Sequence, residues 1–387
     1  MHPPLDILLS ARHLAIQETA RAFADREIRP VAATLDEREG FPDDLYKRMA
    51  KTGFFGVSLP KEDGGVGADT LAYALVMEEI SRGYSALADE LGNVELIGSL
   101  LVTHGTPEQK ARYLTPLLRG EYVSAFALTE PESGSDLAAL RTAAIRRGDG
   151  WVLNGEKTFI HNAPNCHFAV VLARTDEQAG HRGMSTFIVE RSWPGVISGT
   201  RFPKMGQRAS QVGPLAFENV ALPAASLLGV EHRGYHNMMG VFEKGRIGIA
   251  ALAVGILQAA LDASLESAKA RRQFGQPIAD FQAIQWMLVD MAKDTHAARL
   301  MTYAAALRLD RDGRAAVETS MAKCFASDAA VRRTADAIQI AGGRGYMRGS
   351  EVERLYRDAK VTQIYEGTNE IQRLIIARQL LKETVPR

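Results

Sequence analysis

The spacing of apolar residues changes twice along this chain, and that change limits the folds that it can adopt. Up to about residue 120, apolar side chains recur at intervals of three and four, as in 6–23 and 71–81, which is typical of amphipathic helices. From about Glu121 short β-branched or alternating runs follow one another, and from about Glu231 the helical period returns. No strand–helix–strand alternation is present, which disfavours a Rossmann-type sheet.

Turn sequences separate several of the short runs, for example at Asn154-Gly155 and at 193–195. Closely spaced strands of this kind predict a small antiparallel barrel or sandwich. We therefore expect an α+β chain with a helical domain (1–120), a middle β-barrel domain (121–230) and a helical C-terminal domain (231–387). The expected strands are 122–128, 142–146, 151–153, 158–160, 168–173, 185–189 and 214–217, and the longer helices are 245–270, 279–311 and 315–341.

Charge and cysteine content narrow the class of protein. Lysines and arginines number 46 and aspartates and glutamates also 46, so the sequence lacks the basic excess of a nucleic-acid binder. Two cysteines, Cys166 and Cys324, cannot form a disulfide framework, which favours a reducing compartment. The least polar stretch, 247–260, is shorter than the roughly 20 residues of a membrane span. We expect a soluble, cytoplasmic protein with no membrane segment.

Three familiar motifs do not fit. Gly343-Arg344-Gly345 begins like a dinucleotide fingerprint, but it follows a helix and has Arg348 at the third glycine position. The simpler interpretation is that Gly342 or Gly343 ends that helix in the left-handed conformation. His232 and His236 do not form a zinc-protease motif, and there is no nucleophile elbow. Metal, nicotinamide–Rossmann and serine-hydrolase functions are therefore disfavoured.

Four segments, taken together and in order, resemble the acyl-CoA dehydrogenase family. They are 126–136 (FALTEPESGSD), 155–160 (GEKTFI), 271–275 (RRQFG) and a C-terminal stretch comprising 339–346 (QIAGGRGY), 356–360 (YRDAK) and 365–373 (YEGTNEIQR). The resemblance spans the whole chain and implies the family's fold, with a C-terminal four-helix bundle. It also implies FAD as cofactor, an acyl-CoA substrate, an electron-transfer flavoprotein as acceptor, and a homotetramer (a dimer of dimers) because FAD sites are shared between subunits.

The segments also have plain physical interpretations. The turn 129–135 exposes backbone N–H groups that can hold a flavin edge or a diphosphate, although an ordinary strand-ending turn would look the same. Arg271 and Arg272 could simply interact with the carbonyls that end their helix. The resemblance implies FAD contacts from Phe126, Leu128, Thr129, Gly134, Ser135, Phe159, Ile160, His161, Arg271, Gln273, Phe274, Gln282, Gln339, Gly342, Gly343, Thr368 and Glu370. It implies substrate contacts from Ser135, Glu243, Arg246 and Gly367.

Glu366 is the expected catalytic base. Forming a 2,3-enoyl thioester requires removal of an α-proton while a β-hydride passes to flavin N-5, and the base must be a carboxylate shielded from water. Glu366 precedes an amphipathic helix that Thr368 or Asn369 can cap, so alone it could be a helix-start charge. Some family members carry the base directly before the arginine that matches Arg246. Here that position is Gly245, which favours Glu366 and a short- or medium-chain-like enzyme over isovaleryl and long-chain ones.

Other positions bear on specificity. His161 stands where the family usually has Thr or Ser, and we expect a modest tuning of the flavin. Asp89, Glu90 and Glu95 should border the acyl pocket; they predict a solvated face or, less readily, acceptors for a hydroxyl or amino group on the acyl chain. Leu87 replaces the arginine of glutaryl-CoA enzymes, which disfavours a dicarboxylic substrate. Alternatives to the dehydrogenase are an oxygen-using oxidase and an enzyme of carrier-protein thioesters; Glu366 disfavours a non-enzymatic flavoprotein.

Overall fold

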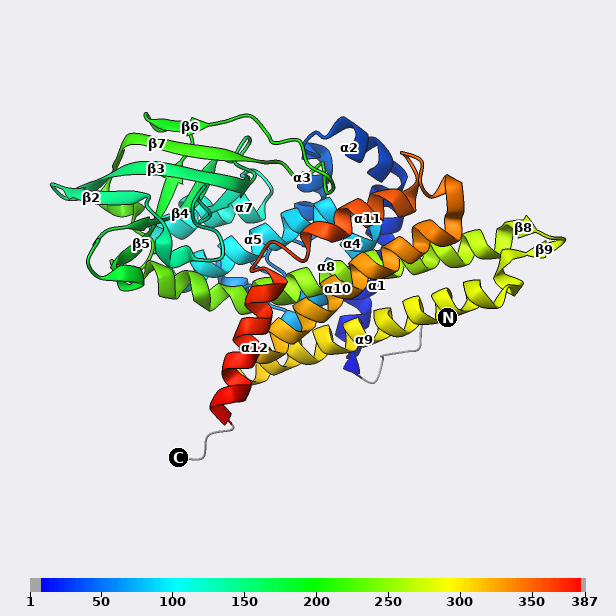
Figure 1. Ribbon diagram of the computed structural model, residues 1–387. Helices are drawn as coiled ribbons and strands as arrows, with labels where there is room; N and C mark the ends of the chain where they lie inside the picture. The colour runs from blue at the N-terminus through cyan, green and yellow to red at the C-terminus, as the bar shows by residue number, and fades with distance from the viewer. Residues whose placement is uncertain (1–7, 384–387) are drawn as a thin grey trace.

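The computed structural model describes residues 8–383 and shows the expected order of a helical, a β and a second helical region (Figure 1). Helix α1 begins after Ser10, whose hydroxyl accepts a hydrogen bond from the His13 backbone N–H at 3.2 Å. Residues 6 and 7 of the predicted first helix lie outside the described residues. The N-terminal helices are α1 (Ala11–Phe23), α2 (Ala32–Arg38), α3 (Asp43–Lys51), α4 (Thr70–Gly83), α5 (Ser85–His104), α6 (Pro107–Gln109) and α7 (Thr115–Leu118).

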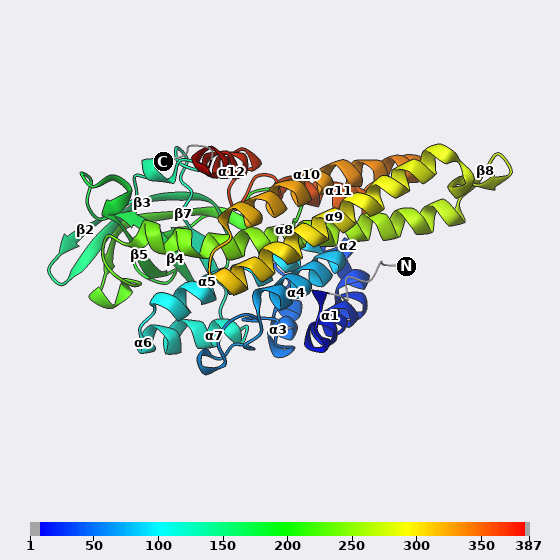
Figure 2. The same ribbon diagram turned by 90° about the horizontal axis from the view of Figure 1, so that it is seen from below.

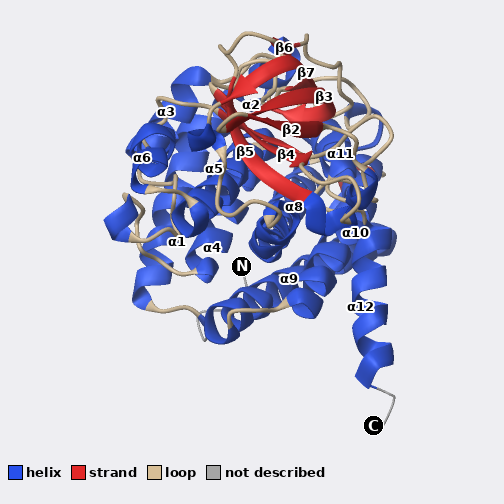
Figure 3. Cartoon of the chain, turned by 90° about the vertical axis from the view of Figure 1, so that its left-hand side faces the viewer, coloured by secondary structure: helices blue, strands red, loops and turns tan. Residues whose placement is uncertain are grey.

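The middle region is one curled sheet (Figure 3) that sits at one end of α8 (Figure 1). Its strands follow the order β1-β4-β2-β3-β7-β6, and β5 pairs with β4. Most pairs are antiparallel, as expected, but both β1 and β2 pair with β4 in parallel. The strands are β1 (Ser124–Ala127), β2 (Ala143–Arg147), β3 (Gly150–His161), β4 (Phe168–Arg174), β5 (Met184–Glu190), β6 (Val196–Ser198) and β7 (Val212–Leu222).

Two predicted strands, 151–153 and 158–160, belong to the single strand β3, so the predicted turn at Asn154-Gly155 is wrong. The strand instead carries an irregularity there, because the register against β7 shifts between Leu153 and Gly155. Gly155 has φ +145, and a Cβ at this position would lie 2.6 Å from the Thr142 Cα. The glycine therefore serves a close approach of β3 to the start of β2 rather than a reversal of the chain. Strand β6 was not predicted.

The C-terminal region is built on the long helix α8 (Gly234–Ala270), which starts earlier than the predicted residue 245. It contacts α4 and α5 of the first region and also α9 and α10 (Figure 2). By length and composition α8 could cross a membrane, but 89% of its most apolar window is buried inside the protein. The remaining elements are β8 (Arg272–Gln273), β9 (Gln276–Pro277), α9 (Gln282–Asp312), α10 (Ala316–Ala341), α11 (Glu351–Val361) and α12 (Asn369–Glu383).

Gly155→Ala should destabilise the protein by about 3 kcal/mol, since the alanine would be strained at this φ and would press on the Thr142 backbone. Thermal unfolding measures the change. Gly240→Ala is the matched control: it lies exposed within α8 with no atom within 4 Å of an added Cβ. That change should be neutral or stabilising by up to about 1 kcal/mol. Equal melting temperatures for the two variants would contradict this account of Gly155.

Candidate active site

The Glu366 carboxylate lies against Gly245 of α8. A Cβ at position 245 would stand 2.5 Å from Glu366 Oε2 and 3.3 Å from Leu96 Cδ1. The two alternative positions for a base, considered separately in the sequence, thus meet in space. Oε2 is buried and has no hydrogen-bond partner among the described residues. A buried carboxylate oxygen without a partner is costly, so it marks a place where a ligand is expected.

The surroundings of Glu366 favour the protonated carboxyl near neutral pH. Burial raises its pKa from 4.5 to about 7, and the negative charge of Asp89 acts in the same direction. Arg246, Lys323 and His161 oppose this rise. The result is a carboxyl group whose pKa lies near the working pH, as a general base requires.

The segment that carries Glu366 is fixed at its backbone. Glu366 has φ +55 and Gly367 φ +86. Gln372 Nε2 donates to the Gly367 carbonyl at 2.9 Å, and Lys323 Nζ donates to the same oxygen at 2.8 Å. Thr368 is the residue that caps α12, because its hydroxyl accepts from the Ile371 N–H at 3.3 Å. Lys323 was not singled out in the sequence, where it reads as an ordinary helical lysine.

A buried ion pair joins the two β segments predicted to face the flavin. Lys157 Nζ donates to Glu130 Oε1 at 2.8 Å and to the Leu128 carbonyl at 2.9 Å. Glu130 also accepts from the Thr142 N–H at 2.9 Å, and the Thr158 N–H donates to the Thr129 carbonyl at 2.9 Å. This pair was missed in the sequence, although strand alternation places Lys157 on the same side of β3 as buried Leu153.

The surface formed by these segments suits a planar aromatic group. Phe159 is 69% exposed and has φ +55, whereas its neighbour Ile160 is buried. Gly134 and Ser135 are exposed in the turn after β1, and Leu128 is buried at its start. An exposed aromatic side chain on strained backbone, beside a turn with free space, is a feature that a bound flavin would explain.

His161 faces two carboxylates instead of standing alone. Its Nε2 lies 2.9 Å from Glu90 Oε1 and 3.5 Å from Asp89 Oδ2. Burial lowers the pKa of the imidazole, but Asp89 and Glu90 outweigh this effect and raise it to about 9. His161 is therefore an imidazolium at neutral pH.

The three acidic residues of α5 do not form the expected solvated face. Glu90 and Glu95 are fully buried, and Asp89 Oδ2 accepts from Ser210 Oγ at 2.8 Å. Glu90 Oε2 accepts from Asn162 Nδ2 at 2.7 Å, and Glu95 Oε1 accepts from the Ser58 N–H at 3.1 Å. The three carboxylates are buried because they bind His161 and residues outside α5, namely Ser58, Asn162 and Ser210. The spacing of residues along α5 carried no information about these partners. A contact with a polar acyl chain stays a prediction.

A second set of predicted cofactor residues lies at the far tip of the molecule, at the end opposite the sheet (Figures 1 and 2). Arg271 Nη1 donates to the Ala341 carbonyl at 2.9 Å, so it contacts the end of α10. Gly342 follows that helix with φ +63 and ψ −144, which is not the predicted left-handed helical conformation, and Phe274 is 93% exposed on the β8–β9 turn. One chain therefore does not bring this set to Glu366. The set comprises Arg271, Gln273, Phe274, Gln282, Gln339, Gly342 and Gly343.

Two positively charged features lie along α8, namely Arg246 and a hollow with two arginines at the start of the helix. Arg246 has a buried Nε without a partner among the described residues, and burial lowers its pKa. Glu243 accepts a hydrogen bond from the Ala315 N–H, which ties α8 to the start of α10. A hollow of about 240 Å³ opens where α8 begins, lined by His181, Arg182, His232, Arg233, Tyr235, His236 and Met239.

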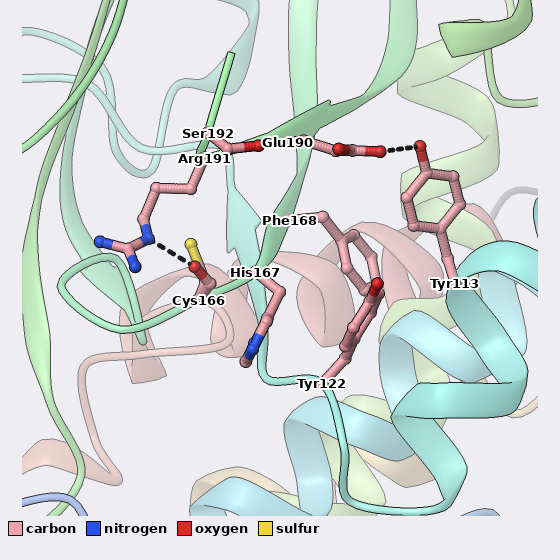
Figure 4. Close-up of a pocket in the computed structure, with 8 residues that line it drawn as sticks. All are labelled: Tyr113, Tyr122, Cys166, His167, Phe168, Glu190, Arg191 and Ser192. Atoms are coloured by element: carbon pink, nitrogen blue, oxygen red, sulfur yellow. Dashed lines mark hydrogen bonds between the residues drawn. The ribbon is translucent and has the colours of Figure 1, made fainter.

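The larger described cavity, of about 380 Å³, contains none of the predicted site residues. It is lined by Tyr113, Tyr122, Cys166, His167, Phe168, Glu190, Arg191 and Ser192 (Figure 4). Both of its charged groups are already engaged, since Glu190 accepts from Tyr113 at 2.8 Å and Arg191 donates to the Cys166 carbonyl at 2.7 Å. We assign it no role in the reaction.

Comparison with known proteins places the chain in a family. Family models described as acyl-CoA dehydrogenase N-terminal, middle and C-terminal domains match residues 10–121, 125–220 and 232–381. The chain thus has the architecture of a flavin-dependent oxidoreductase. It belongs to the acyl-CoA dehydrogenase family, and the predicted fold class, enzyme class and FAD cofactor are confirmed.

Individual relatives cover nearly the whole chain. It is 45% identical to the 3-(aryl)acrylate reductase of Clostridium sporogenes, over 97% of this chain and 100% of that protein. It is 42% identical to the caffeyl-CoA reductase–Etf complex subunit CarC of Acetobacterium woodii, over 97% and 99%. The structure of butyryl-CoA dehydrogenase from Megasphaera elsdenii is similar with a TM-score of 0.93 at 37% identity, over 96% and 99% of the two chains.

Lys157→Met should leave Glu130 buried without its cation and destabilise the protein by about 3–5 kcal/mol. FAD should also be lost more readily on dialysis, because the Lys157–Glu130 ion pair joins the two β segments that are expected to contact the flavin. Unfolding and flavin retention are the measurements. Lys47→Met changes an exposed lysine and should do neither. The double variant Lys157→Met with Glu130→Gln should recover part of the stability; failure to recover any would argue against the pair as the cause.

Proposed function

We propose that this protein oxidises an acyl-CoA thioester to its trans-2-enoyl-CoA with Glu366 as the base. The observation that carries the proposal is the Glu366 carboxylate itself, with an unpartnered buried Oε2 and a pKa of about 7. Glu366 takes the α-proton and the β C–H bond breaks with its electron pair. Bound FAD supplies the acceptor for that hydride. The arrangement excludes water from the carboxylate, which keeps the base reactive toward a weak carbon acid.

The CoA moiety would extend along α8. His236 and Arg246 are separated by about 15 Å along the helix axis, given a rise of about 1.5 Å per residue. The basic hollow at the start of α8 can attract phosphate groups, while Arg246 remains near the base. Ser135, Glu243 and Gly367 remain proposed substrate contacts. Glu243 in this arrangement holds the helix that presents Arg246.

We further propose a homotetramer, arranged as a dimer of dimers, in which each FAD site uses residues of two chains. The separation of Phe274 and Arg271 from Glu366 within one chain supports shared sites. The apolar side chains of Trp286 and Val289 on α9 and of Leu374 on α12 are exposed in the single chain. Such surfaces favour association.

An electron-transfer flavoprotein is the proposed electron acceptor, and the cytoplasm the proposed location. The relative named as a subunit of a reductase–Etf complex supports this partner. Two relatives carry names of aryl-acrylate or caffeyl-CoA reductases, which favours a second candidate: the same chemistry run toward the saturated thioester. In that direction Glu366 would return the α-proton, and a pKa of about 7 leaves enough of the protonated form to do so.

The rate of flavin bleaching by a short- or medium-chain acyl-CoA, mixed anaerobically, should rise with pH through about 7, because only the ionised Glu366 accepts a proton. Glu366→Gln should slow bleaching by about 10³-fold. Glu266→Gln, which changes an exposed glutamate of α8, is the control and should match the parent. Bleaching by Glu366→Gln at the parental rate would remove Glu366 as the base. Reoxidation by electron-transfer flavoprotein rather than by air separates the dehydrogenase from an oxidase.

Phe274→Asp should weaken FAD retention and shift the assembly toward smaller species, since a carboxylate would replace the exposed ring expected at a subunit contact. Sedimentation velocity and the ratio of flavin to protein check both effects. Ile145→Asp alters another exposed apolar residue, on β2, and should leave both unchanged. A parental protein that sediments as a monomer with bound FAD would contradict shared sites.

A further inference from the structure

Lys323 of α10 is a fully buried lysine whose ammonium group reaches the segment that follows Glu366. Its Nζ donates to the Gly367 carbonyl at 2.8 Å and to Asn369 Oδ1 at 3.0 Å. Asn369 is in turn fixed by Asp328, whose Oδ1 accepts from Asn369 Nδ2 at 2.8 Å. The lysine therefore binds the polypeptide on the C-terminal side of the base through a short and fully specified network.

The conformation at this point needs such support. Glu366 and Gly367 are consecutive residues with positive φ, and for a glutamate this backbone region is strained. The Gly367 carbonyl belongs to the Gly367–Thr368 peptide, the next one after the base, so fixing its direction restrains the segment that directly follows Glu366. Gln372 Nε2 already donates to this oxygen at 2.9 Å. A second donor is thus not needed merely to satisfy the carbonyl.

The charge of the second donor requires its own explanation. Burial lowers the pKa of Lys323 to about 8, and the negative charge of Glu366 opposes that fall. A neutral side chain would avoid the desolvation cost of a buried ammonium group. The cation is useful only if it acts on a nearby negative charge. Among the negatively charged groups that raise the pKa of Lys323, Glu366 has the largest effect.

Several other charged groups surround the pair and must be counted. Toward Glu366 these are Asp89 from α5, His161 from β3 and Arg246 from α8. Toward Lys323 they are Cys324 and Asp328 from α10 itself and Glu370 from α12. Among the described residues, Lys323 is the only one of these cations that also donates a hydrogen bond to the segment carrying Glu366.

We propose that Lys323 is a positioning residue for the base, holding the Gly367 carbonyl so that the Glu366 carboxylate is aimed into its recess, and stabilising the ionised form of that carboxylate. This inference rests on the proposed role of Glu366. It assigns two separable effects to one side chain, a hydrogen bond that sets geometry and a charge that sets the ionisation of the base.

Two substitutions separate the effects. Lys323→Gln keeps a donor but removes the charge, so the pH midpoint of anaerobic flavin bleaching should rise by about one unit, with a rate about fivefold lower near pH 7. Its plateau at high pH should stay within about twofold of the parent. Lys323→Met removes both, so the plateau itself should fall by about ten- to a hundredfold. Neither should change the acyl-CoA concentration at half saturation.

A second measurement needs no substrate. The raised pKa of Glu366 means that the folded state loses stability as pH increases through about 7, because the folded protein must then give up a proton that it favours. Removing the Lys323 charge raises that pKa further. The fall in melting temperature between about pH 6 and about pH 8 should therefore be larger in Lys323→Gln than in the parent. Adding Glu366→Gln to both proteins should remove the part of this difference that Glu366 causes and leave only the part due to Lys323 itself, whose pKa of about 8 lies in the same range.

Ala337→Gly is the matched control for a weakened α10. It changes a buried residue about four turns along the helix from Lys323 and should lower the melting temperature without moving the pH midpoint. An unchanged midpoint and an unchanged melting profile in Lys323→Gln would overturn the proposal for Lys323 while leaving Glu366 as the base. Parental bleaching by Glu366→Gln would instead overturn the base assignment, so the two failures are distinguishable.

Discussion

Close packing around α8 is the constraint on which the other parts of this protein depend. Glycines along this helix let four neighbours approach where a side chain would collide: Ser185 of β5 at Gly234, Glu366 at Gly245, Tyr73 of α4 at Gly248 and the Glu78 carbonyl at Gly255. One helix thereby sets the distance between the sheet, the N-terminal helices and the base. Glycine lowers the intrinsic stability of a helix, so an isolated helix with these glycines would be unstable. In the buried helix α8 the close packing that they permit offsets this cost. A helix that satisfies four partners at once leaves little freedom in how the regions dock.

Much of the fold could be predicted because its signals are local. The spacing of apolar residues and the turn residues predicted the helical, β and helical regions. Helices α4 and α10 lie almost where that spacing indicates. The errors arise where a glycine serves a tertiary contact. Gly155 was interpreted as a turn although it sits within β3, and α8 begins at Gly234, which packs against Ser185, rather than at the predicted residue 245. Sequence spacing cannot tell a glycine that bends the chain from one that makes room for another segment. The domain boundaries at 120 and 230 stay predictions.

The candidate site divides in the same way. Glu366 could be predicted because its motif carries the chemistry, and Gly245 because it occupies the rival position. The partners that tune the site could not be predicted, since each lies far away in sequence. Examples are Glu90 beside His161, Glu130 beside Lys157 and Lys323 beside Gly367. Each is a charged residue buried by its partner, and a helix or strand pattern shows only that a charge is present. The individual FAD contacts stay predictions.

The distance between the β8–β9 tip and Glu366 has a consequence for mixed assemblies. With each FAD site built from two chains as proposed, a copy lacking its base and a copy lacking its tip residues are defective in different sites. Co-assembled, two such copies can build one intact centre from their undamaged halves, together with one centre that lacks both. A lesion near Glu366 and a lesion at the β8–β9 tip would therefore complement between subunits, whereas two lesions in the same one of these two places would not.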